Sequence, residues 1–345
     1  MSNTVLSVIV PVYNGRDYLR CLVKNILDKN KQIIENIELI LVDDGSTDGS
    51  YELLAALSTK HPCIKVFQKD NGGIASARNF GLLHANGMYV TFMDQDDSLT
   101  QSYEPFLRAI ANSQSDVLIS DYSILDFNGK VNSQKMGVTE DSLFEGKNVA
   151  MKLLCGPLCN DVRLSDISIP PSVWNCIFKR ETLNKHDCHF FSFVDYEDDW
   201  LFLIQILQVS KVVMLTPKEY YCWAVNKNSE SHSIKYIPNL LSKKQALEAW
   251  IINSLSQLSV GKKDRDMVAW RFEAHSLVEC FYNSSLNLPY KRYKKEILQA
   301  KDQLSPKLLS VKLPIVQNVF RSLLWHKCYF IAFVLNRYVL KRHFH

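Results

Sequence analysis

Met88-Tyr-Val-Thr-Phe-Met-Asp-Gln-Asp-Asp97 is a short apolar run that ends in a cluster of acidic residues. Four other runs of comparable character cover residues 6–13, 38–44, 64–67 and 116–120. Short runs that are rich in β-branched residues and lack polar alternation are typical of strands buried on both faces of a parallel sheet.

Helical segments are expected between these runs, at 16–28, 50–58 and 75–85. This alternation of strand and helix predicts an α/β fold with a Rossmann-like, mostly parallel open sheet flanked by helices. From about residue 236 the pattern becomes mostly helical, basic and rich in aromatic residues. We therefore expect a first domain at 1–235, divided near residue 121, and a helical C-terminal region at 236–345.

The composition is that of a globular protein, with 345 residues, 47% hydrophobic and 22% charged. The nine cysteines are scattered and suggest reduced thiols in a cytoplasmic protein. Neither a signal peptide nor a membrane-spanning run is predicted. The charge is uneven, because residues 235–345 hold 19 Lys/Arg and 7 Asp/Glu, whereas residues 1–234 hold 21 and 29. This asymmetry indicates a carboxylate-rich domain and a C-terminal region that meets something anionic.

Acidic residues follow two of the predicted strands and are expected to meet in space. Asp43 and Asp44 end one strand, whereas Asp94, Asp96 and Asp97 end another. Ligands of open α/β sheets bind beyond the carboxyl ends of the strands. Such carboxylates suit Mg²⁺ or Mn²⁺, and a cation there could stabilise a diphosphate leaving group. The alternative is that these acids only cap turns and helices.

Two further motifs carry possible chemistry. Asn71-Gly-Gly precedes a predicted helix, where Arg78 could reach a base, phosphate or carboxylate. Asp195-Tyr-Glu-Asp-Asp-Trp200 places four acids before an apolar run. One of these carboxylates could act as a general base, or the group could simply complement a helix dipole.

Taken together, these motifs resemble those of the inverting family 2 glycosyltransferases, which have the GT-A fold. The resemblance covers about residues 5–235. It rests on segments 8–14, 40–48, 71–79 and 92–97, with support from 173–180 and 197–199. It implies that 1–121 is the nucleotide-sugar half of the catalytic domain and that 122–235 is the acceptor half.

The resemblance also implies residue roles. Asp43 would hydrogen-bond uracil with Arg78 nearby, and Asp94 would lie against the ribose or sugar. The full set implied to bind the nucleotide sugar is Pro11, Tyr13, Asn14, Asp43, Asp44, Arg78 and Asp94. Asp96, with Asp97, would hold Mn²⁺ or Mg²⁺.

The implied catalytic base is Asp198 or Asp199, with Asp198 favoured. Segment 231–233 is similar to a late family loop near the diphosphate. Cys176 departs from the family, which often has Lys at that position, so no acceptor or phosphate contact is assigned to it.

The implied reaction moves a hexose, with glucose or galactose favoured, from a UDP-sugar to a saccharide linked to undecaprenyl diphosphate. It inverts the anomeric carbon and gives a β-glycoside in surface polysaccharide synthesis, such as O-antigen of lipopolysaccharide. The basic, aromatic segment 321–345 suggests peripheral attachment to anionic lipid at the cytoplasmic face of the inner membrane. The alternative is that segment 321–345 is an ordinary helical appendage. No nucleic-acid partner is expected.

Three other functions are weighed against this one. The run Val90-Thr-Phe-Met-Asp-Gln-Asp96 is similar to the nucleophile motif of haloacid-dehalogenase phosphohydrolases, although that motif usually lies near the N-terminus. A nucleotidyltransferase would need a basic, glycine-rich loop after the first strand. A non-catalytic relative that binds carbohydrate or lipid is the third alternative.

Overall fold

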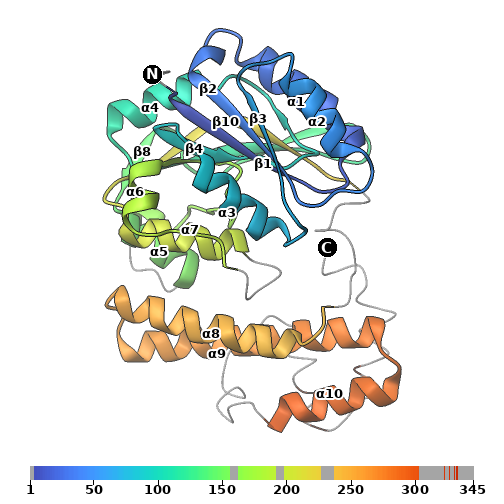
Figure 1. The fold of residues 1–345 in the computed structure, drawn as a ribbon. Helices are drawn as coiled ribbons and strands as arrows, with labels where there is room; N and C mark the ends of the chain where they lie inside the picture. The colour runs from blue at the N-terminus through green and yellow to red at the C-terminus, as the bar shows by residue number, and fades with distance from the viewer. Residues whose placement is uncertain are drawn as a thin grey trace. The chain divides into compact units, whose positions relative to one another are not determined.

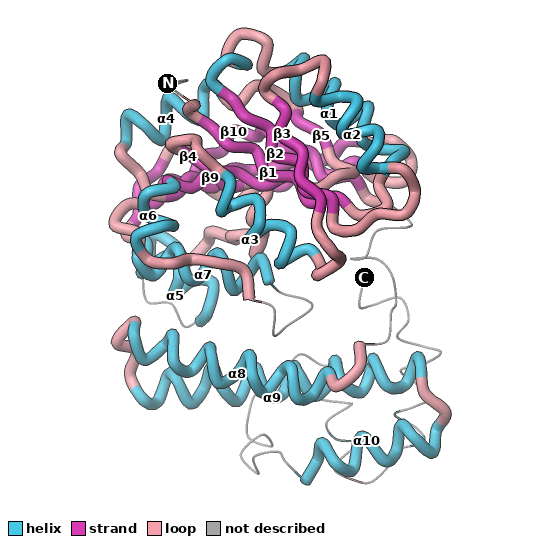
Figure 2. The backbone as a smooth tube through the Cα atoms, in the orientation of Figure 1, coloured by secondary structure: helices cyan, strands magenta, loops and turns pink. Residues whose placement is uncertain are grey.

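The computed structural model describes residues 4–155, 162–191, 198–226 and 237–302, together with residues 322, 326, 330 and 332. The chain forms two compact units, Met1–Asn226 and Lys227–His345. Figures 1 and 2 show that the first unit contains the sheet and that the second is helical in its described part. The expected domain boundary at 235 and most of segment 321–345 lie outside the described residues.

Ten strands of the described residues form one sheet in the first unit. They are β1 (Leu6–Val12), β2 (Ile37–Asp43), β3 (Ile64–Gln68), β4 (Tyr89–Phe92), β5 (Ser98–Leu99), β6 (Val117–Leu125), β7 (Val131–Gln134), β8 (Ser142–Phe144), β9 (Cys176–Lys179) and β10 (Val213–Ala224). The order is β3-β2-β1-β4-β9-β6-β10-β5, with β7 on β6 and β8 on β10.

The sheet has two halves that differ in direction. Strands β3, β2, β1 and β4 are all parallel. Beyond β4 the sheet is mixed, because β9 runs antiparallel to both β4 and β6, whereas β6 and β10 are parallel. The expected α/β open sheet is confirmed. The half formed by β3, β2, β1 and β4, which the sequence predicted most clearly, is entirely parallel.

Helices cover both faces of this sheet, as Figure 1 shows. The helices of the first unit are α1 (Arg16–Lys29), α2 (Ser50–Ser58), α3 (Ile74–His84), α4 (Glu104–Ser113), α5 (Gly146–Cys155), α6 (Arg180–Lys185) and α7 (Asp198–Val209). Two 3-10 turns, η1 (Ile34–Asn36) and η3 (Val162–Leu164), lie between α1 and β2 and between α5 and β9. Helices at 16–28, 50–58 and 75–85 were predicted from the sequence, and α1, α2 and α3 lie within one residue of those bounds.

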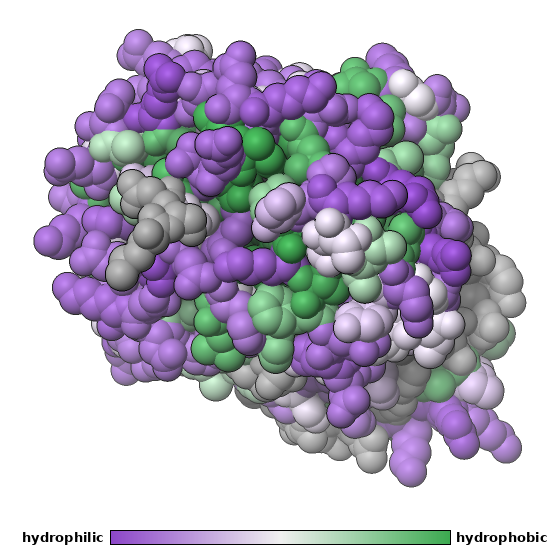
Figure 3. All heavy atoms as spheres, turned by 45° about the horizontal axis from the view of Figure 1, so that its top comes forward, coloured by the Kyte–Doolittle hydropathy of each residue, from purple (hydrophilic) through white to green (hydrophobic). Residues whose placement is uncertain are grey.

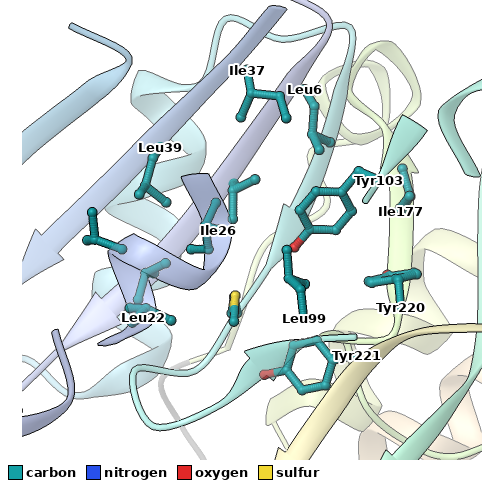
Figure 4. Packing of buried hydrophobic residues seen from close by; sticks show 14 of the residues in the cluster. Leu6, Leu22, Ile26, Ile37, Leu39, Leu99, Tyr103, Ile177, Tyr220 and Tyr221 are labelled. Atoms are coloured by element: carbon teal, nitrogen blue, oxygen red, sulfur yellow. The ribbon is translucent and has the colours of Figure 1, made fainter. Parts of the chain in front are cut away.

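The core has one layer on each face because side chains alternate along each strand. Val8 and Val10 pack with Leu22 and Ile26 of α1 in the larger cluster, part of which Figure 4 shows. On the other face, a β-carbon at Gly81 of α3 would lie 2.4 Å from Ile9 Cγ2. The glycine therefore allows α3 to approach β1 closely.

Aromatic rings fill the second layer under α7. The Phe92 ring packs edge-on against Phe190 and Phe202, with centroids 5.0 Å and 5.6 Å apart. The Phe190 and Phe202 rings are stacked at 4.2 Å. This packing fixes the start of α7 beside the end of β4, where the acidic motifs lie. The outer surface drawn in Figure 3 is largely hydrophilic, with apolar side chains in small groups.

The second unit contains α8 (Leu240–Gln257), α9 (Lys262–Asn287) and α10 (Tyr290–Asp302). Lys244 of α8 is 1% exposed and pairs with Glu279 of α9. This ion pair joins α8 to α9 and gives the buried Lys244 ammonium group a carboxylate partner. None of the helices in the described part of the chain is both long and apolar enough to cross a membrane.

Candidate active site

The ends of β1, β2 and β4 are tied together by side chains that bond to neighbouring backbone. Gln95 accepts from the Tyr13 N–H and donates to the Tyr13 carbonyl, both at 3.1 Å. Asn14 has a positive φ of 46°, donates its N–H to Ser46 Oγ at 2.9 Å and accepts from the Thr47 N–H at 2.8 Å. The three motifs that follow these strands therefore form one edge, and the Tyr13 ring remains 49% exposed there.

Asp43 and Asp44 are adjacent in sequence, but their carboxylates lie in different environments. Asp44 is buried and accepts from the N–H groups of Gly72 and Gly73 at 3.0 Å and 2.7 Å, and from Lys69 Nζ at 2.6 Å. Its carboxylate therefore holds the glycine loop at the start of α3. Asp43 Oδ2 accepts two weak hydrogen bonds at 3.3 Å, whereas Oδ1 is buried and has no hydrogen-bond partner.

Arg78 is the centre of a cluster of carboxylates. Its side chain is 2% exposed, and its Nη2 lies 3.0 Å from Asp94 Oδ1. Its Nη1 lies 3.2 Å from Asp198 Oδ2 and also contacts Asp199 Oδ1. The guanidinium is 5.2 Å from the centre of the Phe190 ring. One side chain on α3 therefore joins the end of β4 to the start of α7.

The two carboxylates on α7 differ in how they are held. Asp199 uses both oxygens, because Oδ1 contacts Arg78 and Oδ2 accepts from the Val173 N–H at 3.4 Å. Asp198 contacts Arg78 through Oδ2, and its side chain is 13% exposed. Both lie in the first turn of α7, where the helix dipole favours negative charge.

Charge in this cluster is unbalanced, since one guanidinium faces three carboxylates. Burial disfavours the Arg78 cation, but attraction to Asp199, Asp94 and Asp198 outweighs this and raises its pKa. Burial raises the pKa of Asp199 to about 7 despite the attraction of Arg78, and repulsion from Asp198 and Asp94 adds to the rise. A proton is therefore held within the cluster up to near-neutral pH.

This proton gives a testable dependence of stability on pH. The pKa of Asp199 in the folded protein, about 7, is above its ordinary value of 3.8. The stability that it contributes is thus complete below about pH 4 and is lost as the pH rises to about 7. Asp199→Asn cannot ionise, so we expect wild type to lose stability relative to this variant between pH 5 and pH 8.

Urea unfolding at the two pH values measures this difference. Asp187→Asn is the matched control, because Asp187 is 99% exposed. Parallel stability profiles for wild type and Asp199→Asn would show that Asp199 carries no raised pKa.

Asp96 and Asp97 also lie in different environments. Asp97 is buried, and both of its oxygens are engaged by β10: Oδ2 accepts from the Tyr221 hydroxyl at 2.5 Å and Oδ1 from the Ala224 N–H at 2.7 Å. The resemblance implied a metal ligand at Asp97, and in the structure its carboxylate anchors the acidic loop to β10. Asp96 is partly buried, and burial together with repulsion from Asp94 raises its pKa.

The described side chains could bind a metal ion only if a bound ligand supplied some of the coordinating atoms. Within the described residues, no group of three or more His, Cys, Asp or Glu side chains could hold a metal ion. Mg²⁺ is commonly bound by one or two carboxylates together with substrate phosphates and water. Asp96, beside Asp94, meets that requirement, because their mutual repulsion favours a cation between them.

The structure also shows contributors that the sequence did not single out. Gln95 and Tyr221 hold the acidic loop, since the Tyr221 hydroxyl bonds both the Asp94 N–H and Asp97. The Tyr221 ring is stacked on Trp174 at 4.6 Å. Cys176, which replaces the usual Lys of the family, is fully buried, and burial raises its pKa well above the ordinary thiol value. Its position therefore does not line the site.

Comparison with known proteins identifies a family match that covers the first part of the chain. Residues 7–151 match the family described as glycosyl transferase family 2. The chain therefore contains a glycosyl transferase family 2 domain. The matched segment contains the strand ends that carry Tyr13, Asp43 and Asp94, together with Arg78. Asp198 and Asp199 lie beyond it.

Three glycosyltransferases match different shares of the chain. GlyA of Streptococcus pneumoniae is 37% identical over 141 residues, which is 41% of this chain and 20% of GlyA. GlyG of the same organism is 40% identical over 120 residues, 34% of this chain and 39% of GlyG. The chain thus spans about a fifth to two fifths of these two relatives. A cholesterol galactosyltransferase of Borreliella burgdorferi is 26% identical over 306 residues, 87% of this chain and 83% of that protein.

Solved structures show the same fold. TarS of Staphylococcus aureus, residues 1–349 with UDP-GlcNAc, has a TM-score of 0.68 at 19% identity. The likeness covers 96% of this chain and 90% of that one. The same TarS fragment with UDP has a TM-score of 0.65. The fold of this chain is therefore of the GT-A type.

Proposed function

We propose that the chain transfers a hexose from a UDP-sugar to a hydroxyl group of a lipid-linked saccharide, with inversion at the anomeric carbon. The observation that carries this proposal is the contact of Arg78 with Asp94, Asp198 and Asp199. It joins the strand edge expected to hold the donor to the helix expected to hold the base. A transferase needs both groups in fixed relative positions.

The donor would lie along the edge formed by β1, β2 and β4. Asp43 Oδ1 is a buried acceptor without a partner, and a nucleobase N–H is a group that would satisfy it. The exposed ring of Tyr13 is available to contact the base. Asp44 serves this site indirectly, because its oxygens are occupied by the glycine loop. The proposed donor residues are thus Pro11, Tyr13, Asn14, Asp43 and Asp94.

A divalent cation, Mn²⁺ or Mg²⁺, would be held by Asp96 with Asp94 and by the donor diphosphate. When bound, it would stabilise the negative charge that develops on the leaving group. Asp97 is left out of the metal site, because both its oxygens bond to β10.

Asp198 is the proposed catalytic base, because Asp199 already uses both oxygens in contacts with Arg78 and Val173. Asp198 would accept the proton of the acceptor hydroxyl. The acceptor oxygen then bonds to the anomeric carbon as the bond to the diphosphate oxygen breaks, and UDP leaves with that electron pair. An α-linked donor would give a β-glycoside. Arg78 positions the base.

The proposed sugar and acceptor are drawn from a relative's name and from the charge of the C-terminal region. A relative that covers most of the chain carries the name cholesterol galactosyltransferase, which favours a hexose and a lipid-bearing acceptor. A saccharide on undecaprenyl diphosphate, for a surface polysaccharide, is the acceptor that we propose. The excess of Lys/Arg in residues 235–345 supports peripheral attachment to anionic lipid at the cytoplasmic face of the inner membrane. The attachment is excluded if the protein stays in the high-speed supernatant and deleting 321–345 changes nothing.

A donor panel tests the proposed function. The protein would be incubated with Mn²⁺, a synthetic lipid-diphosphate sugar, and UDP-glucose, UDP-galactose, UDP-GlcNAc or a GDP-sugar. UDP-GlcNAc is included because a protein of the same fold binds it. We expect UDP release with at least one UDP-hexose, and Asp96→Asn should lower this release while leaving the fold intact. Release of phosphate from simple esters without turnover of any UDP-sugar would contradict the proposal.

A further inference from the structure

A hollow with a volume of about 450 Å³ lies between α5, segment 165–171 and the first turn of α7. Lys152 lines it from α5 and Trp200 from α7. Binding sites for small molecules usually have volumes of about 300–1,000 Å³. The residues that line this hollow take no part in the donor edge described above.

Two residues that line the hollow, Trp200 and Pro171, lie close in sequence to residues that belong to or contact the proposed reaction centre. Trp200 follows Asp198 and Asp199 directly in the first turn of α7. On the opposite wall, Pro171 lines the hollow, and Val173 two residues later donates its N–H to Asp199 Oδ2 at 3.4 Å. Both lining segments therefore continue along the chain to the two α7 carboxylates or to a residue that bonds one of them. A ligand in the hollow would present its groups next to the proposed base.

The lining suits a neutral sugar ring. Trp200 offers a flat aromatic surface, and Ile167 and Pro171 add apolar surface. Lys152, Asp166 and Ser168 offer hydrogen-bond donors and acceptors, and the one cation and one carboxylate cancel in charge. The Lys152 Nζ is fixed by a 3.0 Å hydrogen bond to the Ser165 carbonyl. A pyranose has an apolar C–H face and a rim of hydroxyl groups, which matches this division.

We propose that the hollow binds the acceptor through a neutral pyranose ring that stacks on Trp200. This inference rests on the proposed function, because it places the acceptor of that same reaction. Trp200 is then a residue that selects the acceptor, and Lys152, Asp166 and Ser168 orient its hydroxyl groups. The balanced charge of the lining favours an uncharged ring over a glycosyl phosphate.

Ligand-observed NMR tests the inference without requiring turnover. The full chain with UDP and Mg²⁺ would be titrated with methyl glycosides of glucose, galactose and N-acetylglucosamine, and with glucose 1-phosphate. We expect at least one methyl glycoside to bind, and Trp200→Ala to weaken it about ten-fold through loss of the aromatic contact. Trp200→Phe should restore part of the affinity. Phe127→Ala, which removes an aromatic ring that is 58% exposed, is the matched control and should bind as wild type does.

A second pair of variants keeps the test independent of Trp200. Lys152→Met should weaken glycoside binding, whereas Lys147→Met, on the same helix and 62% exposed, should not. The inference is overturned if no methyl glycoside binds, if glucose 1-phosphate binds better, or if Trp200→Ala and Lys152→Met both bind as wild type does.

A parallel titration with UDP separates the two proposals. We expect wild-type affinity for UDP in Lys152→Met. If UDP does not bind wild type at all, the proposed function fails, and the glycoside titration still reports on the hollow. If Trp200→Ala loses UDP affinity as well, its structure is altered outside the hollow. The glycoside affinity of Lys152→Met then determines whether the inference holds.

Discussion

Asp198→Asn is expected to lower kcat by about 10²–10⁴-fold, the range that removal of a general base usually costs. Asn has nearly the same shape as Asp and can keep the contact between its side-chain oxygen and Arg78, but it cannot accept a proton from the acceptor. The affinity for UDP should change much less than kcat, because Asp198 lies on α7 and not on the donor edge. Initial rates of UDP release and a titration with UDP measure the two effects.

The neighbouring residue provides the matched comparison. Asp199→Asn makes the same change of side chain one position further along α7, where both oxygens already have partners. We expect a clearly smaller loss of kcat than for Asp198→Asn. A larger loss in Asp199→Asn would transfer the role of base to Asp199.

Arg78→Lys is expected to lower kcat by about 10²-fold, because small displacements of positioned groups cost about that much. The guanidinium contacts Asp94 through Nη2, and Asp198 and Asp199 through Nη1. An ammonium group keeps the charge but is a single point, so it cannot hold three carboxylates from two elements in the same arrangement. Donor and base should therefore lose their relative positions.

The control for Arg78→Lys is Arg108→Lys, because Arg108 is 76% exposed and pairs with Glu104 within α4. Its kcat should equal that of wild type. Since Arg78 acts as a positioning residue, its loss should also change the pH profile, because Asp199 is no longer held by the guanidinium. Full activity with an unaltered pH profile in Arg78→Lys would contradict the role given to this residue.

The sequence was most informative where one type of residue repeats along an element. Strand β1 is buried at every position, and its apolar run predicted it within one residue. Strands β5 and β9 have two and four residues, too few for a pattern, so the mixed half of the sheet could not be predicted in detail. Their pairing depends on tertiary contacts that periodicity does not encode.

The site, like the fold, could be predicted from the sequence only in part. Adjacent acids such as Asp43 and Asp44 look equivalent in sequence, yet one carboxylate holds the glycine loop and the other keeps an unpartnered oxygen. Which oxygen is satisfied depends on neighbours that are distant in sequence, as for Asp97 and Tyr221, 124 positions apart. The link from Arg78 to α7 is of this kind and could not be seen from the motif alone.

The most direct test of the account is the anomeric configuration of the product. An α-linked UDP-hexose that supports turnover would be combined with the acceptor and Mg²⁺, and the new linkage would be followed by proton NMR. The account predicts a β-glycoside, because Asp198 activates the acceptor on the side of the sugar opposite the diphosphate. An α-glycoside formed by the same protein would contradict the single-displacement chemistry assigned to the Arg78–Asp198 centre.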